Sequence, residues 1–191
     1  FSGTASSGLG NVTLNAGTGG VDFGVDVTTT GSLTETSEGA IAGAGALTVG
    51  DTASFNTSGT ANATVVSNSA LTLGTSTVGG DFTVTVNGAN SLNVSGNVTT
   101  SGNIIAKAES SGGDITMATG GSFKAGTGTI NLSADQDITL GLLTTSSSVT
   151  LNSTNGGVRD ADSTSLDISA SSLIANLVTG FGTADNAIET N

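Results

Sequence analysis

Short runs in which apolar and small polar residues alternate recur along almost the whole chain. Typical examples are Val12-Thr13-Leu14, Phe82-Thr83-Val84 and Leu166-Asp167-Ile168. Alternation with a period of two predicts a β-strand with one buried face. Each run is too short to form a sheet alone, so the strands are expected to stack on copies of themselves, as in a β-solenoid. Further runs begin at Leu47, Ala53, Leu71, Leu92, Ile115, Ile130, Ile138 and Val149.

The spacing of these runs predicts the size of one solenoid turn. From Ala53 onward, every second run begins 15 to 23 residues after the previous one. Pairs of glycines between the runs, such as Gly79-Gly80 and Gly112-Gly113, suit sharp corners because glycine adopts positive φ at little cost. We therefore expect an all-β parallel β-helix with two or more strands in each turn. At about 19–20 residues per turn, the 191 residues would make about nine or ten turns.

The pattern predicts one continuous β-solenoid segment over residues 1–191. Val21 to Val27 alternate strictly and predict one strand. Residues 172–178 are expected to be extended, because their Ser, Thr and Gly flanks carry no helix cap. By regularity, the chain divides into less regular residues 1–50, regular turns over 51–170 and a junction-like segment over 171–191.

Composition and charge narrow the classes of function. Gly, Ser and Thr supply 89 residues, but 35% hydrophobic and only 9% charged residues argue against disorder. The net charge is −12, with Lys107, Lys124 and Arg159 as the three cations. So few cations cannot form a nucleic-acid-binding surface, and the negative charge disfavours anionic membranes. No run approaches the ~20 apolar residues of a membrane-spanning helix, so we expect neither nucleic-acid binding nor membrane insertion.

The absence of histidine and cysteine removes several kinds of catalysis. Ser-His-Asp and Cys-His catalysis, His- or Cys-ligated metals and disulfides are excluded. The first ten residues contain neither a basic region nor an apolar core, so no signal peptide is recognisable there. Because the chain does not begin with Met, we interpret it as a processed product or an internal segment. The sequence predicts no catalytic residue and no cofactor.

Two pairs of acids are candidate calcium ligands. Asp160 and Asp162 place carboxylates at alternate positions, as do Asp135 and Asp137. Calcium prefers oxygen ligands, but neither pair has the turn Gly and distal Glu of an EF-hand loop. We therefore expect solvated acids at solenoid corners and no metal site.

Three stretches resemble the haemagglutinin-type repeats of filamentous haemagglutinin-like adhesins and other giant bacterial exoproteins. They are Gly113-Asp114-Ile115-Thr116-Met117, residues 128–140 and residues 178–190. Together they cover most of residues 110–191, and the rest matches only in composition and alternation. The resemblance implies a right-handed parallel β-helix, secretion by two-partner or autotransporter-like routes, and adhesion at the bacterial cell surface.

These observations predict a structural or adhesive shaft segment of a secreted, extracellular protein or filament. Its expected partners are neighbouring copies or further repeats along the rod axis, and a glycan or protein receptor at a cell surface. One alternative is a polysaccharide-active β-helix enzyme that uses Asp135, Asp137, Asp160 and Asp162 with Arg159, although no Trp or Tyr is present to stack on sugars. Another is an ice-binding solenoid, but the Thr-x-Thr pairs do not recur once per turn.

Overall fold

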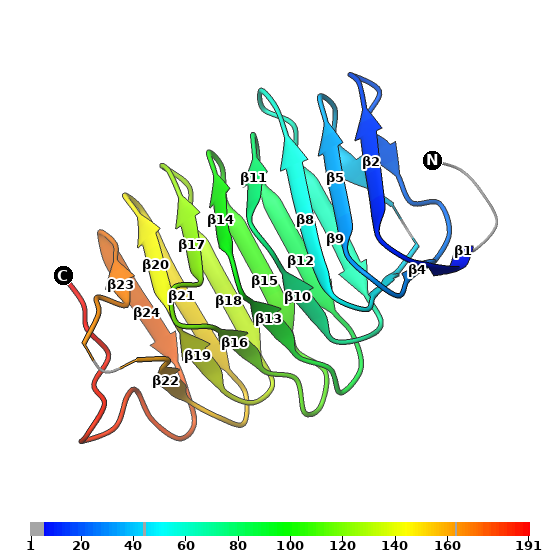
Figure 1. Cartoon of the computed structure of the whole chain (residues 1–191). Helices are drawn as coiled ribbons and strands as arrows, with labels where there is room; N and C mark the ends of the chain where they lie inside the picture. The colour runs from blue at the N-terminus through cyan, green and yellow to red at the C-terminus, as the bar shows by residue number, and fades with distance from the viewer. Residues whose placement is uncertain (1–5, 44, 163) are drawn as a thin grey trace.

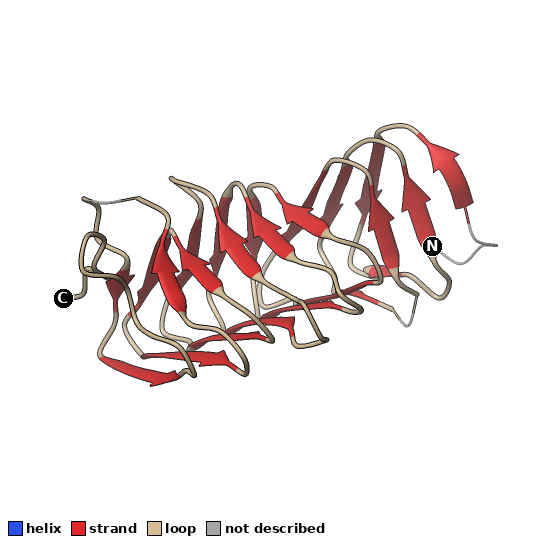
Figure 2. Ribbon diagram, turned by 90° about the horizontal axis from the view of Figure 1, so that it is seen from below, coloured by secondary structure: helices blue, strands red, loops and turns tan. Residues whose placement is uncertain are grey.

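The computed structural model describes residues 6–43, 45–162 and 164–191, which form a parallel β-solenoid. The described residues contain 24 strands and no helix, so the predicted fold class is confirmed. Figures 1 and 2 show the strands stacked along one axis, with the two ends of the chain at opposite ends of the stack. Residues 1–5, half of the ten residues in which no signal peptide is recognisable, lie outside the described residues.

Each of the eight turns contributes three strands. The turn count is lower than nine or ten because the turns are longer and more variable than predicted. Ala63 pairs with Phe82, 19 residues later, whereas Ile104 pairs with Ile130, 26 residues later. Corner loops absorb this difference, while the strands stay in register.

From β9 onward, the strands form three parallel stacks. The first stack contains β10 (Leu71–Leu73), β13 (Leu92–Val94), β16 (Ile115–Met117), β19 (Ile138–Leu140) and β22 (Val158–Asp160). The second contains β11 (Ser76–Val78), β14 (Asn97–Thr100), β17 (Ser122–Ala125), β20 (Leu142–Thr145) and β23 (Ile168–Ser169). The third contains β9 (Ala63–Ser67), β12 (Phe82–Val86), β15 (Ile104–Ala108), β18 (Ile130–Ala134), β21 (Ser148–Ser153) and β24 (Ser172–Asn176).

The first three turns place their corners differently. β8 (Thr52–Thr57) pairs through Thr52 and Ala53 with β10 and through Asn56 with β11. Conversely, β9 pairs through Ala63 with β6 and through Ser67 with β7. Along the axis, the long strand β8 is thus followed by the two short strands β10 and β11, and the two short strands β6 and β7 are followed by the long strand β9. The remaining strands are β1 (Ser6–Leu9), β2 (Val12–Ala16), β3 (Val21–Asp22), β4 (Val27–Thr29), β5 (Leu33–Ser37), β6 (Ile41–Ala42) and β7 (Leu47–Val49).

This arrangement corrects the single strand predicted over Val21 to Val27. The structure has β3 and β4 there, separated by a corner at residues 23–26. Gly43, one turn later, has a φ of 152°, and a Cβ there would come within 2.4 Å of the Phe23 carbonyl oxygen. The corner is therefore set by close backbone stacking, which alternation in the sequence does not reveal.

The predicted inward positions are confirmed as the core. Alternate residues of the strands point into the solenoid, where they stack on their equivalents in neighbouring turns. Phe55, Phe82 and Phe123 are fully buried, and the rings of Phe55 and Phe82 lie with centroids 6.1 Å apart. The apolar residues that end seven of the predicted runs are all buried, namely Leu73, Val84, Val94, Met117, Leu132, Leu140 and Leu151.

The C-terminal part gives one confirmation and one correction. The extended structure expected at residues 172–178 is present as β24. The run Leu166-Asp167-Ile168, however, is not a strand with two inward apolar residues. Leu166 is 41% exposed, whereas Asp167 is buried and precedes the short strand β23.

The stacked core makes inward and outward positions unequally sensitive to substitution. Leu132 pairs with Ala106 in the turn before and Leu151 in the turn after, and it is fully buried. We expect Leu132→Asp to cost several kcal/mol, because an unpaired charge enters an apolar interior. Thr139→Ser, at a neighbouring outward position, should cost within about 0.5 kcal/mol. Urea unfolding followed by circular dichroism measures both, and equal losses would contradict the inward register.

Candidate functional site

Aspartate and asparagine side chains form a repeated structural element at the solenoid corners. In each case, the Asp or Asn directly precedes a strand and accepts a hydrogen bond from the backbone N–H at the equivalent position one turn later. Asn62 Oδ1 accepts from Asp81 (2.8 Å), Asp81 Oδ1 accepts from Asn103 (2.7 Å), and Asn103 Oδ1 accepts from Thr129 (2.8 Å). These ladders satisfy backbone donors that the sharp corner leaves without a strand partner.

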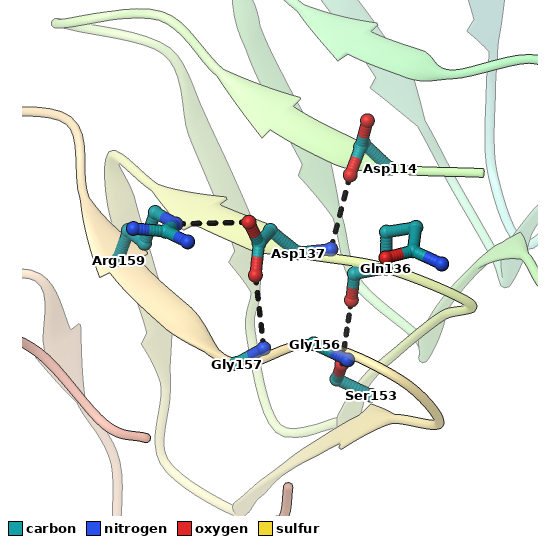
Figure 3. A network of polar contacts seen from close by, with 7 residues as sticks. All are labelled: Asp114, Gln136, Asp137, Ser153, Gly156, Gly157 and Arg159. Atoms are coloured by element: carbon teal, nitrogen blue, oxygen red, sulfur yellow. Dashed lines mark hydrogen bonds and ion pairs between the residues drawn. The ribbon is translucent and has the colours of Figure 1, made fainter. Parts of the chain in front are cut away.

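A second ladder of this kind runs through the stretch that resembles haemagglutinin repeats. Asp114 Oδ1 accepts from the N–H of Asp137 (3.0 Å), and Asp137 Oδ1 accepts from Gly157 (3.0 Å), as Figure 3 shows. Asp137 Oδ2 also pairs with Arg159 Nε at 2.9 Å. Partial burial acts to raise the pKa of Asp137, but the Gly157 hydrogen bond and the Arg159 guanidinium lower it overall. The acids of this ladder are structural acceptors.

Asp135 and Asp162, two of the predicted calcium candidates, are also surrounded by donors. Asp135 accepts hydrogen bonds from Gly112 N–H (2.7 Å), Gln136 Nε2 and Asn155 Nδ2. These bonds, that from Gly112 foremost, lower the pKa of Asp135. Asp162 Oδ1 accepts from the N–H groups of Thr164 and Ser165, which likewise lower the pKa of Asp162. Both carboxylates stabilise loops.

Asp160, the remaining calcium candidate, points into the solenoid, whereas the adjacent Arg159 points outward. Its carboxylate lies beside those of Asp167 and Glu189, two acids that were not among the predicted calcium ligands. Its position in β22 pairs with the buried Leu140 of the preceding turn, so its side chain points inward. Carboxylate oxygens of Asp160, Asp167 and Glu189 lie within 4.8 Å of one another. Asp160 and Asp167 are buried, and Glu189 is partly buried. The carboxylate of Asp160 thus lies with those of Asp167 and Glu189, while its Oδ1 also accepts a hydrogen bond from the backbone N–H of Asp162 at 2.8 Å.

Asp167 and Glu189 meet because they occupy equivalent corner positions. Asp167 Oδ2 accepts a hydrogen bond from the N–H of Glu189 at 2.9 Å, which repeats the corner ladder between β23 and the segment above it. Burial raises the pKa of Asp167 to about 7, and the adjacent carboxyl groups of Glu189 and Asp160 add to this rise. In the sequence, the signal for the corner position of Asp167 was an Asp directly before the apolar residue that begins a strand.

Glu35 is a second buried acid that the sequence analysis did not select. It lies at an inward position of β5, paired with Leu14 in β2 and Phe55 in β8, and it is fully buried. Neither carboxylate oxygen has a hydrogen-bond partner among the described residues. Burial raises the pKa of Glu35 to about 8, so this side chain is mostly neutral at pH 7. The alternation Leu33-Thr34-Glu35 was the signal for its inward position.

An open groove of about 390 Å³ lies beside β17 and β20. Asn97, Lys124, Asp162 and Leu166 are among the residues that line it. The segment carrying Asp162 leans back over two turns, where the Thr119 hydroxyl hydrogen-bonds to the Ala161 carbonyl at 3.3 Å. The groove combines one cation, one carboxylate and an exposed apolar side chain, which suits contact with a polar ligand at the surface.

Fold and corner ladders together define a repeat protein of the parallel β-solenoid class. Residues 9–62 match a family described as repeats of unknown function (DUF5649). The matched range covers β2 to β8, which are the turns before the corners move. No curated protein and no solved structure matches the chain. Among the described residues, there is no helix long and apolar enough to cross a membrane.

Ionisation of Glu35 should make stability depend on pH. Because its pKa is about 8 when folded and about 4.5 when unfolded, the folded state holds the proton more tightly. Stability from this residue is therefore complete below about pH 4.5 and is lost as pH rises through about 8, a decline of a few kcal/mol in total. We expect Glu35→Gln to remove this decline and to stabilise the protein at pH 8–9.

Urea unfolding between pH 5 and 9 measures this effect. Glu38→Gln, at an exposed glutamate of the same turn, is the matched control and should follow the wild-type profile. Parallel profiles for wild type and Glu35→Gln would show that Glu35 does not titrate inside the core.

Proposed function

We propose that this chain is a shaft segment of a secreted bacterial surface protein or extracellular filament, with a structural and adhesive role. The observation that carries the proposal is the axial register, which runs without a shift from the fourth turn to the eighth. Leu71, Leu92, Ile115, Ile138 and Val158 form one inward column, each paired with the next. Backbone hydrogen bonds and apolar contacts both join successive turns, so the solenoid is a rod whose length is set by the number of turns.

The outward residues support an extracellular role. The outward column beside these inward residues is polar, with Thr72, Asn93, Thr116, Thr139 and Arg159 in successive turns. Such a surface keeps an elongated rod soluble at a net charge of −12. The resemblance of residues 110–191 to haemagglutinin-type repeats supports the bacterial cell surface as the location. The groove beside Lys124 and Asp162 is the surface at which we propose a glycan or protein receptor binds.

A rod built of equivalent turns should shorten by one step when one turn is removed. Deleting residues 115–137 joins Asp114 to Ile138, which occupies the same register position as Ile115. The protein has no cysteine, so Thr13→Cys and Thr139→Cys create the only two labelling sites for spin labels. Pulsed electron paramagnetic resonance should show the label separation falling by about 5 Å, the spacing of one strand.

The matched control for this experiment deletes residues 115–126. It removes two strands of the turn and breaks the register, so the protein should unfold rather than shorten. Loss of folding after removal of the complete turn as well would contradict a modular shaft.

The C-terminal edge of the third stack is where we propose that a neighbouring copy docks along the axis. Leu173 and Ala175 of β24 pair with the buried Val149 and Leu151 of β21 but have no described strand on their other side. Leu173 is 37% exposed, whereas Val149 is fully buried. An open parallel edge with apolar side chains favours pairing with another strand.

This docking predicts concentration-dependent elongation. The protein should form larger species in sedimentation velocity as its concentration rises, and Leu173→Lys should suppress them, because a charge at the edge opposes strand addition. Thr150→Lys, on the outward side of β21, should leave association unchanged. A monomer at every concentration would contradict axial docking of copies.

A further inference from the structure

The carboxylates of Asp160, Asp167 and Glu189 form a compact negative site at the C-terminal end of the solenoid. Their oxygens lie within 4.8 Å of one another. No Lys or Arg among the described residues pairs with them, because the nearest cation in sequence, Arg159, faces outward and binds Asp137 at 2.9 Å. When all three are ionised, these carboxylates therefore repel one another without a counter-charge from the described residues.

Asp160 supplies an independent sign that a ligand belongs in this site. Its side chain takes the inward position that Leu140 occupies one turn below, and it is only 9% exposed. Oδ1 accepts a hydrogen bond from Asp162 N–H at 2.8 Å, but Oδ2 is buried and has no partner among the described residues. An unpaired buried carboxylate oxygen is costly, unlike the donor-saturated oxygens of Asp135.

Two further oxygens beside the cluster are unpartnered as well. Glu189 Oε2 is buried without a hydrogen-bond partner among the described residues, and so is Asn186 Oδ1. The Asn186 amide is held next to the cluster, because its Nδ2 hydrogen-bonds to the Asp160 carbonyl at 3.4 Å. The site thus gathers carboxylate and amide oxygens with free lone pairs and few donors.

We propose that Asp160, Asp167 and Glu189 bind a calcium ion. The donors are all hard oxygens, which select Ca²⁺ or Mg²⁺ over softer metals. Ca²⁺ binds oxygen at about 2.3–2.6 Å, so ligands on opposite sides of the ion lie about 4.6–5.2 Å apart, which matches a cluster of this size. Mg²⁺ requires about 2.0–2.1 Å and near-ideal octahedral geometry, whereas these acids come from three separate places, strand β22, the corner before β23 and the C-terminal segment.

The ion would connect two levels of the solenoid. Asp160 and Asp167 belong to the eighth turn, whereas Glu189 lies in the segment above it, where Phe181 bridges to Val158 and Thr190 to Ile168. Bound calcium would replace repulsion between these levels with shared coordination. Calcium binding should therefore stabilise the last turn, in contrast to the solvated acids expected from the sequence.

Calorimetric titration of metal-stripped residues 1–191 with CaCl₂ tests the proposal. Wild type should bind one Ca²⁺ per chain in the micromolar to millimolar range, with a rise in melting temperature. The double variant Asp160→Asn, Glu189→Gln keeps the shape and hydrogen-bonding oxygens but removes two charges. It should bind at least tenfold more weakly and, without calcium, should melt at a higher temperature than metal-free wild type.

Asp114→Asn is the matched control, because it removes a corner carboxylate outside the cluster and keeps the oxygen that accepts from Asp137. It should bind calcium as wild type does. Absence of both heat and a melting shift up to about 10 mM CaCl₂ would overturn the proposal. An equal response to MgCl₂, or undiminished binding by the double variant, would also overturn it, since either result indicates general charge screening.

Discussion

The whole structure depends on the parallel, in-register pairing of each turn with the next. Each strand residue packs against the residue at the equivalent position of the next turn. The side chain at each position must therefore fit against the side chain of that partner. The inward column from Leu71 to Val158 is apolar because each member covers the one below it. The corner ladders follow the same rule, since Asp81 bonds to Asn103 rather than to its own neighbours in sequence. Core packing and corner chemistry are thus two results of one axial repeat.

The sequence predicted what depends on alternation, and this covered most of the core. Inward residues such as Leu132 and Leu151 were identified because a period of two assigns one face to the interior. The number of turns was not predictable in the same way, because corner loops of different length do not change the strand pattern. Leu166-Asp167-Ile168 was misassigned for a related reason. In the sequence, an Asp at the corner before a strand cannot be distinguished from an outward-facing Asp within a strand.

The acid cluster lay further beyond the reach of the sequence. Glu189 meets Asp167 only because 22 residues separate equivalent corners at that point, and that interval is not constant along the chain. Alternation does place Glu35 inward, but it does not show whether an acid at such a position is buried in the core or whether the register of that strand has been assigned wrongly. The two buried acids Glu35 and Asp160 also differ in their surroundings. Glu35 is enclosed by apolar side chains, which favour its neutral form, whereas Asp160 lies among other carboxylates.

The exchange of corners at β8 and β9 changes the cross-section of the solenoid but leaves its core continuous. Rows of outward side chains on β8 continue across this exchange, because Thr52 pairs with Thr72 of β10 and Asn56 pairs with Thr77 of β11. A ligand that follows these rows lengthwise therefore meets one flat strand in the first three turns and two strands separated by a corner beyond them. The family match to residues 9–62 ends between β8 and β9, where this change of cross-section occurs.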